Sequence, residues 1–221
     1  MELNLTEELL LLFLDDKKGR EVTSHIYVNY GLAGAILSDL VLIHKIDVKD
    51  KKIIILNSKL TNYPVFDDFL KLIRHSHRNK SIKYWARKLG YNRKIKKKIL
   101  KNLIIKGILK KEESYLFGFI PIIRYPAKNL KPKQLIKDKL YKIIIDNKVP
   151  DEKSVMLISL IGVCKLTRHV FKNKEDHKIA KQKIKTMIKD NKMGEMVNET
   201  IKNIHTALIS TIATSAAVAS R

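Results

Sequence analysis

Apolar residues recur along most of this chain every three to four positions, which predicts a mainly α-helical protein. Capping residues, glycines and prolines suggest where the helices begin and end. The expected helices are Leu5–Leu14, Ser24–His44, Pro64–Ile73, Ser81–Leu89, Asn92–Lys106, Gln134–Asp146, Asp151–Phe171, Lys174–Asn191 and Glu195–Ala219. We expect residues 1–221 to form a single helical domain.

Two segments have the pattern of short β-hairpins rather than helices. Residues Lys45–Asn57 contain two β-rich runs around a polar turn at Val48–Lys51. Residues Ile108–Tyr125 form the second expected hairpin, with its turn at the polar run Lys111–Ser114. The predicted fold class is therefore mainly α, with two short β-hairpins.

The sequence does not predict a membrane-spanning helix. The longest apolar stretch, Ile26–Ile43, is interrupted by Asn29 and Asp39, so we expect a buried helix there. The N-terminus opens with Glu2 where a secretory signal would carry positive charge. The one cysteine, Cys164, lies among apolar residues and fits a reducing compartment. We expect a cytoplasmic protein whose membrane contact, if it has any, is peripheral.

The charge of the chain narrows the choice of partner. Lys and Arg number 45 against 22 Asp and Glu, a formal net charge of +23. Such an excess predicts attraction to a polyanion, either nucleic acid or an anionic lipid surface. A genome that favours lysine codons is the alternative explanation.

The positive charge is concentrated between Lys80 and Lys111, a segment without Asp or Glu. In the helix Asn92–Lys106, apolar residues at a spacing of four form one face. The opposite arc carries Arg93, Lys94, Lys97, Lys98 and Lys101. Lys96 lies beside the apolar face, and with Arg93 it can hold one anionic group. An external anion is the expected compensation for this charge.

The run Tyr115–Ile120 is apolar and follows the basic helix. It is either a core strand or a projection that inserts Leu116, Phe117 and Phe119 into the region between lipid headgroups and acyl chains. The order of helix, turn, basic helix and hairpin is also that of a winged-helix nucleic-acid-binding protein. Glu112 and Glu113, at the expected turn, would repel a phosphate backbone, so this alternative is less favoured. A third alternative is a scaffold whose basic face binds an acidic protein.

No catalytic arrangement is present in the sequence. His75 and His77 are the one close histidine pair, and a spacing of two does not place them on the same helical face. There is no phosphate-binding loop and no serine nucleophile motif. We therefore expect neither an enzyme, a metal site nor a cofactor.

Three segments together resemble the Golgi phosphoprotein 3 family. Leu5–Leu12, followed by Asp16–Gly19, is similar to the opening of that family. Gly31–Leu40 resembles its Gly-Leu-Arg-Gly helix, and Lys101–Leu109 resembles its Lys-Asn-Leu-Val-Glu-Lys-Gly-Val-Leu segment. The resemblance covers nearly the whole chain, in order.

The resemblance implies a mainly helical domain with an apolar hairpin that binds phosphatidylinositol 4-phosphate on Golgi-type membranes. The family's headgroup pocket is built from a Trp, an Arg and a later pair of Arg three residues apart. In this sequence those positions correspond to Ser24, Ala33, Arg93 and Lys96. The expected function is thus a peripheral membrane protein on the cytosolic face of a membrane, the Golgi in a eukaryotic cell. Its expected partner is an anionic, phosphoinositide-like lipid, and its protein partners are not indicated.

Overall fold

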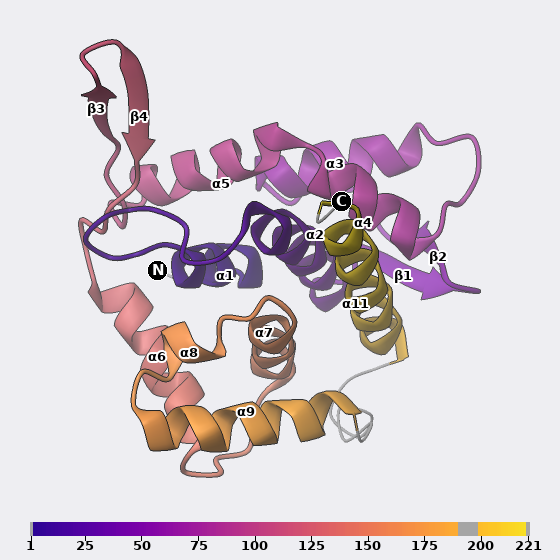
Figure 1. Cartoon of the computed structure of the whole chain (residues 1–221). Helices are drawn as coiled ribbons and strands as arrows, with labels where there is room; N and C mark the ends of the chain where they lie inside the picture. Colours follow the sequence, from indigo (N-terminus) through magenta and orange to yellow (C-terminus); the bar gives the residue numbers. More distant parts are fainter. Residues whose placement is uncertain (1, 190–198, 220–221) are drawn as a thin grey trace.

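The computed structural model describes residues 2–189 and 199–219, and Figure 1 shows helices with two small β-hairpins. The helices are α1 Leu5–Phe13, α2 His25–Leu42, α3 Pro64–Arg74, α4 Ile82–Gly90, α5 Arg93–Ile105, α6 Lys131–Ile144, α7 Glu152–Val163, α8 Thr167–Val170, α9 Lys174–Lys189 and α11 Glu199–Ala219. The strands are β1 Ile46–Lys49, β2 Lys52–Ile55, β3 Glu112–Leu116 and β4 Ile120–Arg124. The predicted fold class is confirmed.

Helix α2 is the central element of the core. It packs against α1, α4, α7 and α11, which lie around it in Figure 1. By length and composition α2 could cross a membrane, but 72% of that window is buried inside the protein. Its small residues allow this close packing: a Cβ on Gly31 would lie 2.7 Å from Cys164 Sγ. Helix α2 is therefore a buried core helix, as the polar interruptions of the apolar stretch Ile26–Ile43 predicted.

The C-terminal helices differ in one respect from the prediction. The expected helix Asp151–Phe171 is two helices, α7 and α8, because Lys165 adopts a φ of 57° between them. Left-handed backbone ends a helix, and the sequence has no glycine or proline at this point to reveal the break. The predicted helix end at Asn191 and helix start at Glu195 lie outside the described residues.

Both hairpins are antiparallel, but the turn of the second is not where the sequence placed it. The first turns at Asp50 and Lys51, as predicted. In the second, Leu116 pairs with Ile120, so the turn is Phe117–Phe119 rather than Lys111–Ser114. Phe117 and Gly118 have φ values of 51° and 79° and reverse the chain there. The polar residues that suggested a turn lie instead at the beginning of β3.

Two buried carboxylates fix α1 against its neighbours and so position α5. Asp39 of α2 accepts hydrogen bonds from the Leu5 and Thr6 amides at 2.9 and 2.8 Å, at the start of α1. Glu7 of α1 is fully buried and pairs with Lys106, the C-cap of α5, at 2.8 Å. The C-terminal end of α5 is therefore attached to the core.

The loop between α1 and α2 holds the base of the second hairpin. The Tyr125 amide donates to the carbonyl of Gly19 at 3.1 Å. Gly19 has a φ of 60°, and a Cβ on it would lie 2.3 Å from the backbone nitrogen of Pro126. This close approach requires glycine, and it sets where β3 and β4 leave the helical body.

Candidate functional site

Helix α5 divides into an apolar and a cationic face. Its buried residues are Ile95, Ile99, Leu100 and Leu103. The side chains that face solvent are Arg93, Lys94, Lys97, Lys98 and Lys101, and Lys96 is half-buried between the two faces. The Asn92 side chain accepts from the Lys94 amide at 3.1 Å and caps the helix. The structure therefore places the predicted basic residues on one continuous surface.

Part of this charge is compensated within the protein, which corrects the expectation that an external anion neutralises all of it. Lys96 pairs with Glu21 at 2.5 Å, and Lys98 pairs with Asp68. These carboxylates lie 75 and 30 residues away in sequence, so the local absence of acidic residues did not reveal them. Within the described part of the chain, Arg93, Lys94, Lys97 and Lys101 form no ion pair.

A pocket of about 460 Å³ lies between α5, the loop before α2 and the base of β4. Its polar lining includes Arg20, Glu21, Ser24, His25 and Lys96. Its apolar lining comes from Leu14, Leu100, Ile123 and Tyr125. Such a shape, part cationic and part apolar, can accept an anionic group with an attached hydrocarbon portion.

Glu21 lies in this pocket between two basic side chains. One carboxylate oxygen accepts from Lys96 Nζ at 2.5 Å, and the other contacts His25 Nδ1. The Glu21 side chain is largely buried, so its charge is poorly screened by water. Lys96 is thus held in the pocket by an internal anion rather than extended into solvent.

The four positions implied by the family resemblance do not all gather at the pocket. Ser24 and Lys96 line it, and Arg93 lies one turn before Lys96 on α5. Ala33 is buried in α2, where it belongs to the core. The sequence did not identify Arg20, Glu21 or His25, because a short polar loop between two helices carries no signal of which side chains turn inward.

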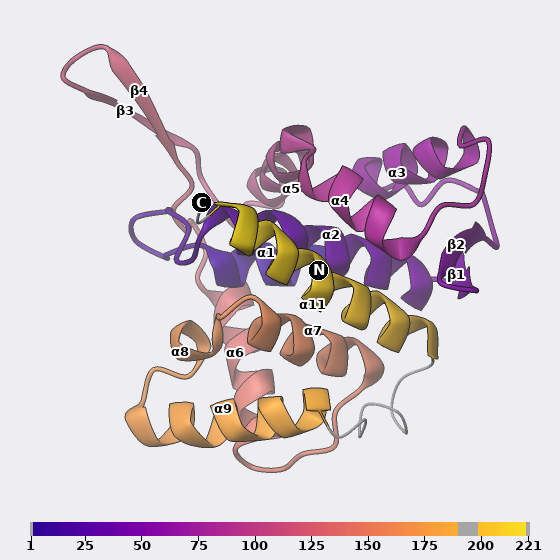
Figure 2. The same ribbon diagram turned by 45° about the vertical axis from the view of Figure 1, so that its right-hand side comes forward.

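The tip of the second hairpin is apolar and open to solvent. Phe117 is 79% exposed and Phe119 is 73% exposed, and Leu116 is also exposed. Figures 1 and 2 both show β3 and β4 projecting away from the helices. Glu112 and Glu113 lie at the base of this ribbon, not at its tip, and pair with neighbouring lysines. The sequence allowed Tyr115–Ile120 to be either a core strand or an exposed projection. The exposure of this segment shows that the core-strand interpretation is wrong.

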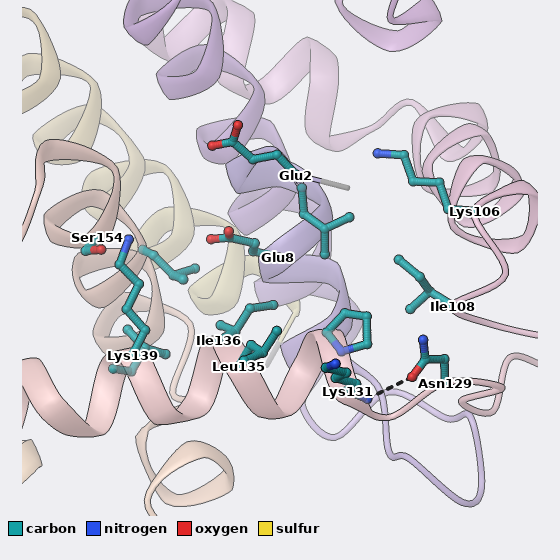
Figure 3. A pocket seen from close by; sticks show the side chains of 14 residues that line it. Glu2, Glu8, Lys106, Ile108, Asn129, Lys131, Leu135, Ile136, Lys139 and Ser154 are labelled. Carbon is teal, nitrogen blue, oxygen red and sulfur yellow. Dashed lines mark hydrogen bonds between the residues drawn. The ribbon is translucent and has the colours of Figure 1, made fainter.

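A second groove, of about 520 Å³, lies between α1, α6 and α7 (Figure 3). Figure 3 shows Glu2, Glu8, Lys106 and Lys139 around an apolar floor that includes Ile136. Its charged residues are largely paired within the protein: Lys106 with Glu7, Lys139 with Asp151, and Glu8 with Lys153. Burial raises the pKa of Glu8 despite the hydrogen bond from Lys153. This groove is therefore a weaker candidate for an anion site than the pocket at Lys96.

Fold and site define a helical protein with a cationic helix, a pocket beside it and a projecting apolar hairpin. The family model of Golgi phosphoprotein 3 (GPP34) matches residues 5–204. The chain belongs to the Golgi phosphoprotein 3 family, which confirms the resemblance seen in the sequence.

A curated relative supports the same assignment. The chain is similar to vacuolar protein sorting-associated protein 74 of Schizosaccharomyces pombe, with 26% identity over 175 residues. The alignment covers 69% of this chain and 51% of the relative, so the chain spans about half the length of that curated protein. Family membership gives no support to the winged-helix alternative.

Proposed function

We propose that this protein is a peripheral membrane protein that binds anionic phospholipid headgroups similar to that of phosphatidylinositol 4-phosphate. Three parts contribute: the pocket at Lys96, the cationic face of α5, and the hairpin tip. Leu116, Phe117 and Phe119 insert below the headgroups, and Arg93, Lys94, Lys97, Lys98 and Lys101 attract the anionic surface. In a eukaryotic cell the corresponding membrane is the cytosolic face of the Golgi, as the family name suggests.

The observation that carries this proposal is the exposed hairpin tip. Two phenylalanines at 79% and 73% exposure are costly in water, since burying one such side chain is worth about 1.5–3 kcal/mol. The side chains at the tip are exposed, so the tip can enter another phase without disturbing the core. An apolar tip is also unsuited to lie on a nucleic-acid phosphate backbone.

The cationic face supplies the longer-range attraction. Each basic residue near an anionic leaflet contributes about 1 kcal/mol. Arg93, Lys94, Lys97 and Lys101 have no ion pair in the described residues, so together they could contribute about 4 kcal/mol at low salt. This part of the binding should weaken as salt rises, because the Debye length falls to about 10 Å at 0.1 M ionic strength.

The pocket supports recognition of a phosphate group rather than of surface charge alone. Lys96, Arg20 and His25 surround it, and Ser24 adds a hydroxyl. Serine and alanine at positions 24 and 33 remove the aromatic and guanidinium groups that the family resemblance implies there. We therefore propose binding of an anionic headgroup by this chain with weaker discrimination of the 4-phosphate than the resemblance implies.

Co-sedimentation with liposomes tests the proposal. The vesicles are phosphatidylcholine alone, phosphatidylcholine with phosphatidylserine, and phosphatidylcholine with phosphatidylinositol 4-phosphate at matched total charge. We expect binding to the two anionic compositions and little to the first. The double variant Phe117→Ser/Phe119→Ser should bind at least about tenfold more weakly, since it removes more than 1.4 kcal/mol of apolar transfer. Its unfolding temperature should not change.

The matched control is Leu60→Ser/Val149→Ser, which removes two apolar side chains of 66% and 79% exposure outside the hairpin. It should sediment with liposomes as the wild type does. Arg93→Ala/Lys96→Ala should weaken binding to both anionic vesicles. Equal binding to neutral vesicles, or loss of liposome binding on adding a low concentration of duplex DNA, would contradict the proposal.

A further inference from the structure

A third pocket, of about 530 Å³, lies between the end of α7, α8 and one face of α9. Its floor is apolar and consists of Gly162, Ile184 and Ile188. A Cβ on Gly162 would lie 2.6 Å from Ile184 Cγ2, so the glycine lets α7 and α9 approach closely beneath the pocket. Thr167 and His177 add polar groups to the wall. The volume is in the range of small-molecule sites.

Each charged side chain described at the rim of this pocket is basic. Lys165, Arg168, Lys181 and Lys185 line it, and among the described residues no Asp or Glu does. The nearest carboxylates along α9, Glu175 and Asp176, are not among the lining residues. Among residues 2–189 and 199–219, none of the four cations forms an ion pair.

This arrangement differs from that of the other grooves. In the groove of Figure 3, Lys106 and Lys139 are paired with the protein's own carboxylates, and in the pocket at Lys96 Glu21 supplies a negative charge. In the described part of the chain, the pocket between α7 and α9 is lined by four basic side chains around an apolar floor and by no carboxylate, although Lys165 Nζ also lies 5.1 Å from the centre of the Tyr27 ring. Like charges so arranged repel one another, and an anion bound among them relieves that repulsion.

The neighbouring surface has the same sign. Burial lowers the pKa of His169 on α8, and the positive charges of Arg168, Lys133, Lys172 and Lys137 lower it further. The positive potential therefore extends beyond the pocket, and it would draw an anion toward the mouth.

The pocket lies far from the membrane-facing parts proposed above. Figures 1 and 2 both place α8 and α9 at the end of the molecule away from the tip of the β3–β4 hairpin. When the hairpin enters a bilayer, a pocket at the opposite end faces the aqueous phase. A ligand there comes from solution rather than from the same membrane.

We propose that the pocket between α7 and α9 is a second anion site that binds a soluble organic phosphate with a short apolar group. A phosphate monoester carries a charge of about −1.5 to −2 at pH 7, which suits several cations better than a monovalent anion does. The Arg168 guanidinium can hold two phosphate oxygens, and the lysines act as point charges. The apolar group contacts Ile184 and Ile188. The choice of a soluble rather than a lipid phosphate rests on the proposed function, whereas the anion site itself does not.

Isothermal titration of the full chain with hexyl phosphate tests the site, with inorganic phosphate as the second probe. Hexyl phosphate should bind, and inorganic phosphate should bind at least about tenfold more weakly, because it lacks the apolar contacts. Lys181→Gln/Lys185→Gln should weaken hexyl phosphate binding at least about tenfold. Amide NMR signals of Gly162 and Thr167 should shift on titration of the wild type.

The control Lys174→Gln/Lys178→Gln removes the same charge from α9 outside the pocket lining and should bind hexyl phosphate as the wild type does. Phe117→Ser/Phe119→Ser should also bind it normally, which separates this site from the membrane site. Equal loss in the two lysine variants, or no shift at Gly162 and Thr167, would overturn the proposal. So would a parallel loss of binding to phosphatidic acid vesicles in Lys181→Gln/Lys185→Gln, because the phosphate would then come from a lipid.

Discussion

The substitution Glu21→Gln should strengthen binding to anionic vesicles. Glu21 occupies the pocket as an internal anion, 2.5 Å from Lys96 Nζ and in contact with His25. A lipid phosphate that binds Lys96 must either displace this carboxylate or lie beside it. Glutamine has nearly the same shape and removes the negative charge, so it changes the electrostatics of the pocket while keeping its volume.

The size of the effect follows from Coulomb's law. A phosphate in contact with Lys96 would lie about 6 Å from the Glu21 carboxylate, where the repulsion of two unit charges is about 0.7 kcal/mol in bulk water and about 2.8 kcal/mol at an effective dielectric constant near 20. The side chains of Glu21 and Lys96 are 10% and 32% exposed, so the true value lies between these limits. Affinity for anionic vesicles should therefore rise by about threefold to about a hundredfold.

Liposome co-sedimentation at two salt concentrations measures this change. The control is Asp68→Asn, which removes a carboxylate paired with another lysine of α5, Lys98, outside the pocket at Lys96. Asp68 is half-exposed, so its charge is screened and its loss should alter affinity much less. Equal gains in the two variants, or weaker binding by Glu21→Gln, would refute the assignment of the phosphate position to Lys96.

Two further predictions concern the core that supports the site. Burial raises the pKa of Asp39 to about 6 from 3.8, against the opposing effect of its hydrogen bonds to Thr6 and Leu5. The folded protein therefore holds this proton more tightly than the unfolded chain. The free energy of unfolding should fall by about 2 kcal/mol as pH rises from about 4 to about 6, out of about 3 kcal/mol over the whole titration. Urea unfolding at both pH values should show this fall in the wild type and not in Asp39→Asn; a slope that persists in the variant would assign it to other groups. Gly31→Ala places a Cβ 2.7 Å from Cys164 Sγ and 2.9 Å from Phe13 Cζ, and should cost about 1–3 kcal/mol in urea unfolding. An unchanged urea midpoint would contradict the tight packing described for α2.

Much of the fold could be predicted from the sequence, because the apolar spacing of its helices is regular. Helix α5 is the clearest case: Ile95, Ile99 and Leu103 marked the face that the structure buries. The interruption of Ile26–Ile43 by polar residues correctly indicated a core helix, and Asp39 proves to cap α1 from within it.

The turn of the second hairpin could not be predicted by the same reasoning. Turns are usually polar because they face water, so the run Lys111–Ser114 was the expected position. Here the structure places two phenylalanines at the reversal, with Phe117 at a positive φ. That departure from local preference is itself informative, since conflicts between local rules and structure occur where function imposes them.

The internal ion pairs of the basic residues were the other feature that could not be predicted from the sequence. The pairs that involve Lys96 and Lys106 join residues 75 and 99 positions apart, and only the packing of α1 and its following loop against α5 brings them together. The same holds for the pocket between α7 and α9, whose cations come from α8, α9 and the loop before α8. Composition predicted an anionic partner, but not where on the surface the positive charge would remain available.

The isolated two-stranded ribbon β3–β4 has a consequence for how such proteins diversify. Because its tip contributes nothing to the packed interior, residues there are free to change during evolution without a penalty in folding. Lengthening the ribbon, or exchanging one aromatic for another, would alter how deeply the protein enters a given leaflet. Relatives could thus adapt to bilayers of different thickness or lipid packing through a few substitutions between positions 116 and 120, while the remaining helices stay as they are.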